Sequence, residues 1–563
     1  MVLAGSVAGW RDFASGRRLR LVAEAYDNVV IGAGSAGCAV AARLSEDEGR
    51  RVLLVEAGGS ARRLDVRMPA AFPKQFHSKV DWDYWTEPEP ALAGRRIYEP
   101  RGRMLGGSSA MNAMIYMRGN RLDYDGWAKQ GASGWSYQEV LPLFRRSEHN
   151  EQLRDGFHGQ GGPLNVTTIP TLDPVTRRML DAAMSLGLPP NPDFNGEHQD
   201  GVGRYQVTQR RGRRWTAADG YLRGARRRAG LEVRTRTQAT RLVVEGDRVV
   251  GVELRRGRSV QRVAVSGETV LCAGSFNTPA LLQHSGIGPA DHLRAVGIRP
   301  VLDLPAVGDG LMEHAIAYCT WELAGGHQGL ADAEEPRRLL RWLALGSGKL
   351  ASNVGEAGGF FRSDPSLPAP DLQLYFAPAY FVEHGLQTWD APAMTIALSC
   401  VAPQSRGSVL VRSDDPLRKP AVRLNLLAAQ AEVDAMLTGV DLAREIAGAG
   451  PLDGVVGMEI SPGSAVRSRE ELVRWLRAGV QHTYHPACTA RMGPDGEGAV
   501  DAELRLHGLE GLRVADCSVM PTVIRGNTHA PAVMIGERCA QMMRASGGRA
   551  PAGRKPSPVR VGA

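Results

Sequence analysis

Near the start of the chain, two short apolar runs are separated by a glycine-rich turn and a helix-like stretch. Residues 28–31, Asn-Val-Val-Ile, and residues 51–55, Arg-Val-Leu-Leu-Val, each predict a short buried strand. Between them, a turn with three glycines leads into residues 39–44, which predict a helix. A strand, a turn, a helix and a second strand form one βαβ unit, so we expect a parallel sheet here.

The same segment carries the residue types that a dinucleotide needs. Gly32, Gly34 and Gly37 fit the Gly-x-Gly-x-x-Gly pattern, in which the backbone approaches a pyrophosphate and the helix N-terminus binds it. Ser35 lies inside this turn, and Glu56 directly follows the second strand, where its carboxylate can accept a hydrogen bond from a ribose hydroxyl. The pattern predicts a dinucleotide site and leaves NAD and FAD open.

Two later stretches repeat parts of this pattern. Residues 106–109, Gly-Gly-Ser-Ser, suit either a second close approach of backbone to a large cofactor or an ordinary flexible turn. Residues 269–272 resemble a further buried strand, and Gly274 follows them. The sequence shows no internal repeat.

Length and charge narrow the class of protein. A chain of 563 residues with 43% hydrophobic and 23% charged residues is a folded protein of roughly two to four domains. The net charge of +8 comes from 68 basic and 60 acidic residues, and the densest basic stretch is 204–228. No nucleic-acid-binding motif accompanies it, so we interpret it as a solvated face and expect no nucleic-acid partner.

The cysteines and the two ends of the chain indicate in which cellular compartment the protein is expected. Seven widely spaced cysteines without a Cys-x-x-Cys pair argue against a disulfide framework and a metal site, and they favour the cytoplasm. No apolar run reaches the roughly 18 residues of a membrane span. We expect residues 1–25 to be an extension without a signal peptide, and residues 545–563 to be a disordered tail.

Several segments together resemble the glucose–methanol–choline (GMC) family of FAD oxidoreductases. The resemblance runs from Tyr26 to about Met543 and favours FAD over NAD. The matching segments are residues 102–112, 274–288, 403–407, 485–493, 512–521 and 526–531.

The resemblance implies an α/β fold with two kinds of domain. A doubly wound FAD-binding domain would be assembled from residues 26–166, 204–318 and 471–544. A substrate domain built on an antiparallel sheet would take residues 167–203 and 319–470, with the Pro-rich loop 363–370 inside it.

The resemblance also assigns the site residues. His485 would be the catalytic base and Asn527 its partner at the alcohol oxygen. His482 and His529 are the competing histidines nearby in sequence, and we expect both to be structural. No metal ligand is implied. The implied cofactor-binding residues are Gly32, Gly34, Ser35, Gly37, Glu56, Ala57, Gly106, Gly107, Ser108, Asn112, Met114, Thr240, Ala273, Gly274, Asp516, Cys517, Asn527 and Thr528.

The implied reaction is oxidation of a primary alcohol to an aldehyde, with hydride transfer to flavin N5 and oxygen or a quinone-like acceptor afterwards. A cyanohydrin lyase or photodecarboxylase on the same scaffold is the alternative, and an inactive binding protein is a weaker one. The sequence leaves the oligomeric state open, a homo-oligomer included.

Three positions depart from the family pattern or bear on the substrate. Met111 stands where some relatives carry a histidine bonded to FAD, so we expect non-covalent FAD. Cys488 replaces a glycine beside the active-site histidine. Glu356 and Tyr484 are candidate substrate contacts, which would suit a choline-like cation, although a neutral alcohol is favoured and Glu356 could equally serve a structural ion pair.

Overall fold

The first sheet of the computed structural model, which describes residues 21–546, is built around the predicted βαβ unit. Its strands lie in the order β11-β2-β1-β14-β13-β12, and β26 pairs with β14. β1, β2, β11, β14 and β26 are parallel, whereas β13 and β12 add an antiparallel extension. The bounds are β1 Leu21–Ile31, β2 Val52–Val55, β11 Leu231–Arg234, β12 Gln238–Glu245, β13 Arg248–Arg256, β14 Ser259–Leu271 and β26 Leu512–Val514.

The predicted elements of this unit are present with shifted ends. The helix α1, Ser35–Leu44, begins at the glycine turn and therefore earlier than residue 39. β1 begins at Leu21, inside the stretch expected to be an extension, because its N-terminal part pairs with β14. The rest of the predicted extension and nearly all of the predicted tail lie outside the described residues.

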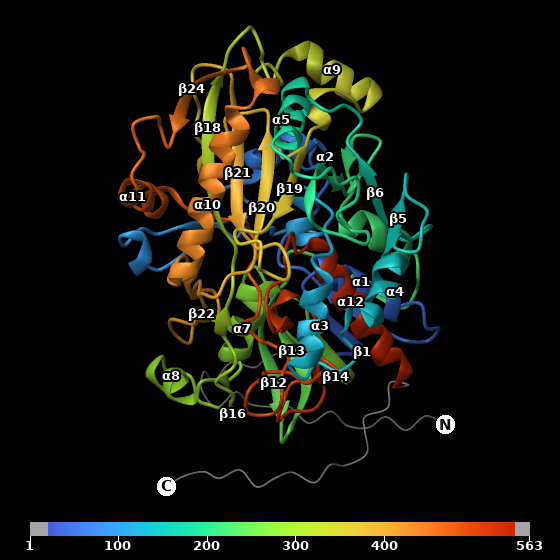
Figure 1. The fold of residues 1–563 in the computed structure, drawn as a ribbon. Helices are drawn as coiled ribbons and strands as arrows, with labels where there is room; N and C mark the ends of the chain where they lie inside the picture. The colour runs from blue at the N-terminus through green and yellow to red at the C-terminus, as the bar shows by residue number, and fades with distance from the viewer. Residues whose placement is uncertain (1–20, 547–563) are drawn as a thin grey trace, which may run out of the picture.

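The second sheet is antiparallel throughout, as the resemblance implied. Its strands lie in the order β24-β18-β21-β20-β19-β7, and β25 pairs with β18. Figure 1 shows it above the first sheet. The bounds are β7 Gly201–Arg204, β18 Ala315–Leu323, β19 Ala357–Phe361, β20 Leu372–Ala377, β21 Ala393–Cys400, β24 Val456–Ser461 and β25 Gln481–His482.

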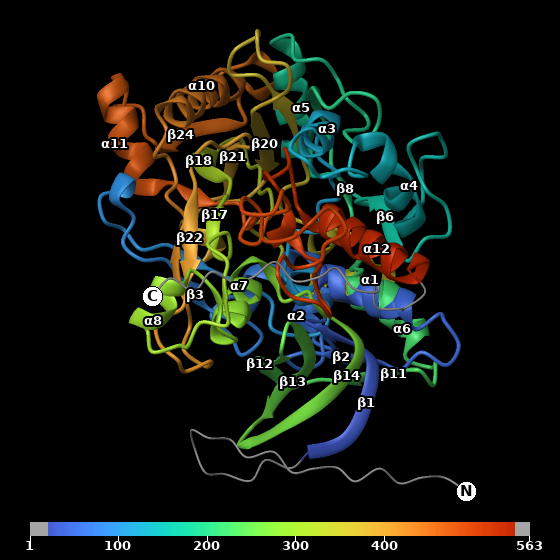
Figure 2. The same cartoon turned by 90° about the horizontal axis from the view of Figure 1, so that it is seen from below.

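Helices cover both sheets. α1 packs beside α12 near the first sheet, and α10 packs on β18, β20 and β21 of the second sheet (Figures 1 and 2). The bounds of the helices after α1 are α2 Leu64–Arg67, α3 Arg121–Lys129, α4 Tyr137–Ser147, α5 Pro174–Ser185, α6 Arg223–Ala225, α7 Gly274–His284, α8 Ala290–Ala295, α9 Pro336–Leu345, α10 Gln430–Ala447, α11 Arg469–Gly479 and α12 His529–Ala545.

The other strands are short and form small two- or three-stranded ladders outside the two main sheets. They are β3 Tyr84–Trp85, β4 Tyr98–Glu99, β5 Glu148–Asn150, β6 Leu164–Thr168, β8 Gln206–Val207, β9 Gln209–Arg210, β10 Arg213–Arg214, β15 Ile287–Gly288, β16 Leu302–Asp303, β17 Asp309–Leu311, β22 Gly407–Leu410 and β23 Ala421–Arg423.

The chain does not pass from one sheet to the other at every expected domain boundary. β18 begins at Ala315, slightly before the boundary at 318, and β25 belongs to the second sheet although it lies after residue 471. The loop 363–370 joins β19 to β20, so it lies inside the second domain as expected. The chain therefore crosses between the two sheets close to, but not at, the predicted positions.

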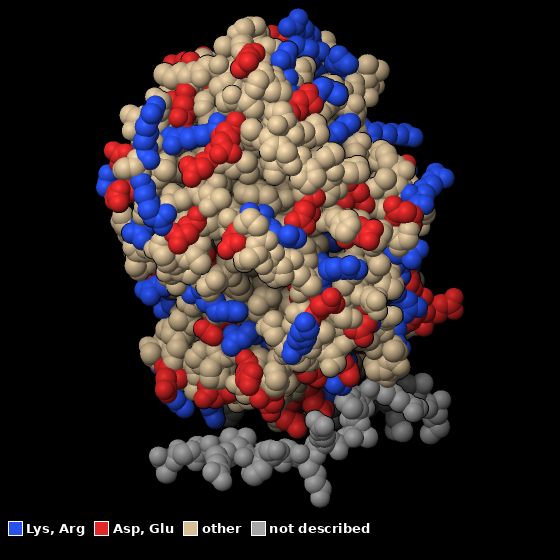
Figure 3. Space-filling model, viewed as in Figure 1, with Lys and Arg blue, Asp and Glu red and all other residues tan. Residues whose placement is uncertain are grey.

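The distribution of surface charge and the state of the cysteines can be compared with the expectations from the sequence. Lys and Arg are interspersed with Asp and Glu over the face in Figure 3. All seven cysteines lie within the described residues and none forms a disulfide. Among residues 21–546, no helix combines the length and the apolar character that crossing a bilayer requires.

Candidate active site

A long cavity starts at the carboxyl edge of the parallel strands and ends against the second sheet. Ile31, Val55 and Cys272, at or just beyond the ends of β1, β2 and β14, line its first part. Residues of β18, β20 and β21 line its far end. Parallel strands bring their carboxyl ends to one edge, which is where α/β folds bind their ligands.

Nearly all the expected cofactor residues line this cavity. Gly37 and Gly106 do not line it; a Cβ on Gly37 would lie 1.9 Å from the Gly32 carbonyl oxygen, so Gly37 allows α1 to pack on the turn. The residues that do line it are Gly32, Gly34, Ser35, Glu56, Ala57, Gly107, Ser108, Asn112, Met114, Thr240, Ala273, Gly274, Asp516, Cys517, Asn527 and Thr528.

The glycine turn fits a pyrophosphate. Gly34 is the N-cap of α1 without any side-chain cap, and the first turn of the helix carries no acidic residue. A Cβ on Gly34 would meet no heavy atom within 4 Å, so the space in front of the helix N-terminus is open. Uncapped amides, free space and the helix dipole are the features that bind phosphate anions.

Glu56 braces this turn. Its carboxylate accepts hydrogen bonds from the N–H groups of Ala33 at 3.0 Å and Gly58 at 2.8 Å. Burial raises the pKa of Glu56 to about 7. Each carboxylate oxygen can accept a second bond, so the geometry still suits a ribose hydroxyl.

The Gly-Gly-Ser-Ser loop meets the first glycine turn. A Cβ on Gly107 would lie only 2.8 Å from the Cα of Gly34. The guanidinium of Arg214 donates to the carbonyl oxygens of Ser109 at 3.3 Å and Asn112 at 2.6 Å. Arg214 is 1% exposed, and burial lowers its pKa to about 9. Part of the basic stretch that we interpreted as solvated is thus buried and holds this loop.

His485 and Asn527 lie together at the far end of the cavity. The distance from His485 Nε2 to Asn527 Nδ2 is 3.2 Å, and Asn527 Oδ1 accepts from Gln373 Nε2 at 3.2 Å. The amide nitrogen of Asn527 therefore faces the imidazole, and Nε2 of His485 is the acceptor in this contact. His485 thus presents an unprotonated nitrogen to the cavity.

The tautomer of the imidazole follows from this contact. Because Nε2 accepts from Asn527, the hydrogen of the neutral ring is on Nδ1, which lies 3.0 Å from His314 Nδ1 and 2.9 Å from Thr483 Oγ1. Burial, followed by His314, holds the pKa of His485 well below its usual range. The imidazole of His485 is therefore neutral.

Sequence reasoning missed the polar residues of the second sheet. Gln373 and Tyr375 lie two residues apart on one face of β20, and the Tyr375 hydroxyl donates to Gln373 Oε1 at 2.8 Å. Gln373 Nε2 also donates to the Tyr205 hydroxyl at 3.2 Å. The alternation of these polar residues with Leu372 and Leu374 was the available signal.

The competing histidines occupy different places. His529 begins α12, lines the cavity, and its Nδ1 lies 2.9 Å from Ser35 Oγ. His482 is buried and does not line the cavity; its Nε2 contacts the Tyr98 carbonyl oxygen at 2.8 Å. Within the described residues, neither ring forms a hydrogen bond with His485 or Asn527.

The two candidate substrate residues lie apart. Tyr484 lines the cavity, and its ring stacks on Phe76 with centroids 6.1 Å apart. Glu356 does not line the cavity; its carboxylate accepts from Asp173 N–H and Thr176 Oγ1, each at 2.9 Å. The carboxylate is thus directed to the start of α5.

One of the two departures from the family pattern lines the cavity, and the other, Cys488, is buried outside its lining. Met111 lines the cavity where a nucleophilic histidine would be needed for a covalent bond. Cys488 is buried and has a backbone φ of 75°, in the left-handed region that favours glycine. Cysteine is therefore accommodated there with backbone strain.

The comparisons with known proteins agree with this architecture. The family model described as GMC oxidoreductase matches residues 26–316 with its N-terminal part and residues 403–536 with its C-terminal part. An oxygen-dependent choline dehydrogenase of Pseudomonas fluorescens is 39% identical, over 96% of this chain and 97% of its own.

Two solved structures are similar over almost the whole chain. Pyridoxine 4-oxidase from Mesorbium loti has a TM-score of 0.85 at 32% identity, covering 92% of this chain and 99% of its own. The formate oxidase of Aspergillus oryzae RIB40, described with an FAD modification, has a TM-score of 0.87 at 26% identity, covering 93% of this chain and 98% of its own. The chain therefore belongs to the GMC oxidoreductase family, and its cofactor is FAD.

Proposed function

We propose that the protein oxidises a neutral primary alcohol to an aldehyde, with His485 as the base. The observation that carries the proposal is the pair of groups at the end of the FAD cavity. An unprotonated imidazole nitrogen and an amide N–H lie 3.2 Å apart, so both can reach one alcohol oxygen.

The residues divide the work in the following way. His485 Nε2 takes the O–H proton while Asn527 donates to the alcohol oxygen, and the electron pair left on oxygen forms the second C–O bond as hydride leaves the carbon. His314 and Thr483 hold the imidazole in the tautomer that can accept the proton. Bound FAD supplies the hydride acceptor.

The cavity lining supports a neutral substrate. Glu56 and Asp516 are the carboxylates among its lining residues, and both follow strands of the first sheet. Around His485 the walls are apolar or aromatic: Phe72, Phe76, Ile316, Tyr318, Val354, Tyr375, Phe381 and Tyr484. A choline-like cation would have aromatic faces but no lining carboxylate at this end.

The decisive experiment follows the flavin absorbance under anaerobic conditions while alcohols are added. We expect bleaching with neutral aromatic or aliphatic alcohols and weaker bleaching with choline. Admission of air afterwards separates an oxidase from a dehydrogenase that uses another acceptor. Turnover without bleaching would instead favour a lyase or photodecarboxylase.

The base is tested by substitution. His485→Ala should keep bound FAD but slow alcohol-driven flavin reduction by roughly 10²- to 10⁴-fold. His198→Ala, at a residue whose side chain is 79% exposed, is the matched control and should reduce at the wild-type rate. A His485→Ala variant that also reduced at that rate would exclude His485 as the base.

A further inference from the structure

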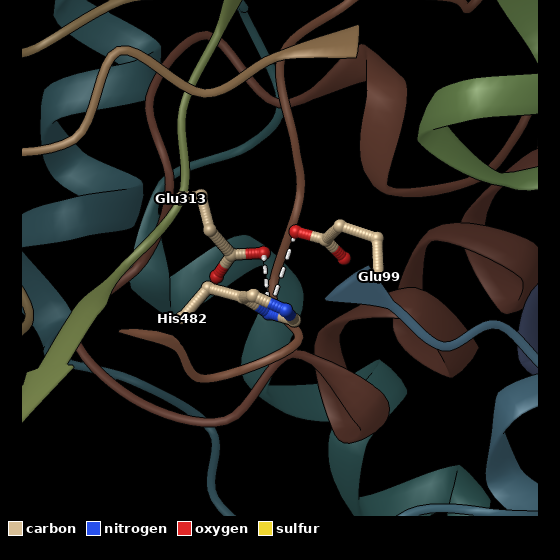
Figure 4. Close-up of side chains that lie close together, drawn as sticks. All are labelled: Glu99, Glu313 and His482. Atoms are coloured by element: carbon tan, nitrogen blue, oxygen red, sulfur yellow. Dashed lines mark ion pairs between the residues drawn. The ribbon is translucent and has the colours of Figure 1, made fainter. Parts of the chain in front are cut away.

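A buried acidic cluster lies behind His485, outside the cavity lining. Figure 4 shows Glu99, Glu313 and His482 converging from three separate stretches of chain. All three side chains have no solvent exposure. Arg101 supplies the positive charge, because its Nη2 lies 2.7 Å from Glu99 Oε2 and 3.9 Å from Glu313 Oε2.

Glu313 is bonded directly to the catalytic segment. Its Oε1 accepts the main-chain N–H of His485 at 2.7 Å and that of His314 at 2.9 Å. One carboxylate oxygen therefore fixes the backbone of both histidines whose imidazoles contact each other. The position of the base depends on Glu313 without any contact between Glu313 and the cavity.

Where Glu99, Glu313 and His482 face one another, the cluster has hydrogen-bond acceptors but no donor. Within the described residues, Glu99 Oε1 and Glu313 Oε2 are buried without hydrogen-bond partners. His482 Nδ1, 3.4 Å from Glu99 Oε1 and 4.0 Å from Glu313 Oε2, already accepts the N–H of Tyr484 at 3.0 Å. Three acceptor atoms therefore face one another, which is unfavourable unless a proton lies among them.

The charges give the same answer. Burial, followed by Arg101, lowers the pKa of His482 to about 3, so His482 is neutral. Two ionised carboxylates beside one guanidinium would therefore leave a net negative charge in a buried site. One proton on the acids makes the group neutral. A metal cation would face the guanidinium of Arg101, so the composition favours a proton over a metal.

We propose that Glu99 and Glu313 share one proton, and that this buried acid pair positions His485 for proton abstraction. Glu313 is a positioning residue that acts through the main chain, and Glu99 holds it in place. This inference rests on the proposed function, whereas the shared proton can be tested without any substrate.

The groups that face the pair are Arg101, His482, Asp81, Glu89, Tyr484, and the backbones of His314 and His485. Burial raises the pKa of Glu99 to about 7 and that of Glu313 well above its usual range. A raised pKa means that the stabilising proton is present below the unfolded pKa near 4.5 and is lost as pH rises through the folded value. Above neutral pH the pair should therefore weaken, together with the position of His485.

Amide substitutions test the pair. In Glu99→Gln or Glu313→Gln, the amide supplies a fixed hydrogen where the proton would lie and leaves one carboxylate for Arg101. Each single variant should reduce flavin within roughly threefold of wild type at pH 7. Glu99→Gln/Glu313→Gln leaves the guanidinium unpaired and should lose on the order of 100-fold, because the base is misplaced.

Two readouts do not require substrate. In infrared difference spectra against each single Gln variant, wild type should show the carbonyl band of one additional buried protonated carboxylic acid, while the contribution of Glu56, which both proteins share, cancels. The melting temperature of wild type should fall relative to Glu99→Gln as pH rises from about 4.5 through 7, since the folded wild type holds a proton that the unfolded chain releases over this range.

Several outcomes would overturn the proposal. They are single Gln variants as impaired as the double variant, an infrared difference spectrum without the acid band, identical pH dependence of wild type and Glu99→Gln, or stoichiometric metal in the purified protein. If no alcohol reduces the flavin while the infrared band and the pH difference are present, the proposed function fails and the shared proton stands.

Discussion

At the scale of single residues, His485 lies between two residues with strained backbone, Tyr484 and Cys488. Tyr484 has a φ of 66° and Cys488 a φ of 75°, values that non-glycine residues rarely adopt. The Tyr484 backbone is held on both sides, by its N–H to His482 Nδ1 and by its carbonyl oxygen, which accepts from Arg101 at 2.8 Å. The turn that presents His485 is thus fixed by bonds that offset its strain.

Cys488 gives a direct measure of this strain. Cys488→Gly removes the unfavourable φ, whereas Cys488→Ala keeps it while losing the same buried sulfur. We expect the glycine variant to be more stable than the alanine variant by roughly 1 kcal/mol, measured by thermal or denaturant unfolding. An alanine variant as stable as the glycine variant would show that the left-handed backbone costs little here.

At the scale of elements, Glu356 links the start of α5 to the strand β19. The helix begins at Pro174 with Asp173 as N-cap, whose side chain accepts the Val175 N–H at 2.9 Å. Glu356 adds the bonds from Asp173 N–H and Thr176 Oγ1, and burial raises its pKa. Its carboxylate therefore completes the helix N-terminus.

Removal of this carboxylate should affect folding more than substrate choice. Glu356→Ala leaves a buried N–H and a hydroxyl without their acceptor, which should cost about 1–3 kcal/mol of unfolding free energy. Thr176→Val, which removes one of the two donors, should cost less. Flavin reduction by choline and by a neutral alcohol should change equally, and a selective loss with choline would instead assign Glu356 to cation binding.

At the scale of the whole molecule, the cavity joins segments from most of the chain. Its lining includes residues of the first glycine turn, the Gly-Gly-Ser-Ser loop, the strands of both sheets and the start of α12. FAD bound there would contact segments that are far apart in the sequence. Binding of FAD is therefore coupled to the stability of the whole fold.

Removal of FAD should lower the melting temperature. At a free FAD concentration about 100 times the dissociation constant, the gain in unfolding free energy is about 2.7 kcal/mol, and it should vary with FAD concentration. Because Met111 offers no nucleophile, acid precipitation should release the yellow colour into the supernatant. Colour retained in the pellet would contradict non-covalent binding.

The local elements and the nucleotide end could be predicted from the sequence. β1, the turn and α1 follow from short-range preferences, since β-branched residues favour strands and only glycine fits the close contacts at Gly32 and Gly37. Most of the expected cofactor residues line the cavity, and several do so because they directly follow parallel strands, as Gly32 and Glu56 do, or begin helices, as Ser35 and Gly274 do. His485 and Asn527 were identified by motif and are neighbours in the structure.

Only the tertiary structure decided what surrounds His485 and Asn527. Gln373 lies in β20, Tyr205 directly follows β7 and His314 directly precedes β18, so the assembly of the second sheet brings them to the site. The acid pair was equally hidden, because Glu99 and Glu313 are distant in sequence and each would ordinarily be a surface residue. The sequence by itself determined the glycine turns at the cofactor end through local geometry, whereas tertiary packing and burial determined the position and the neutral charge state of His485.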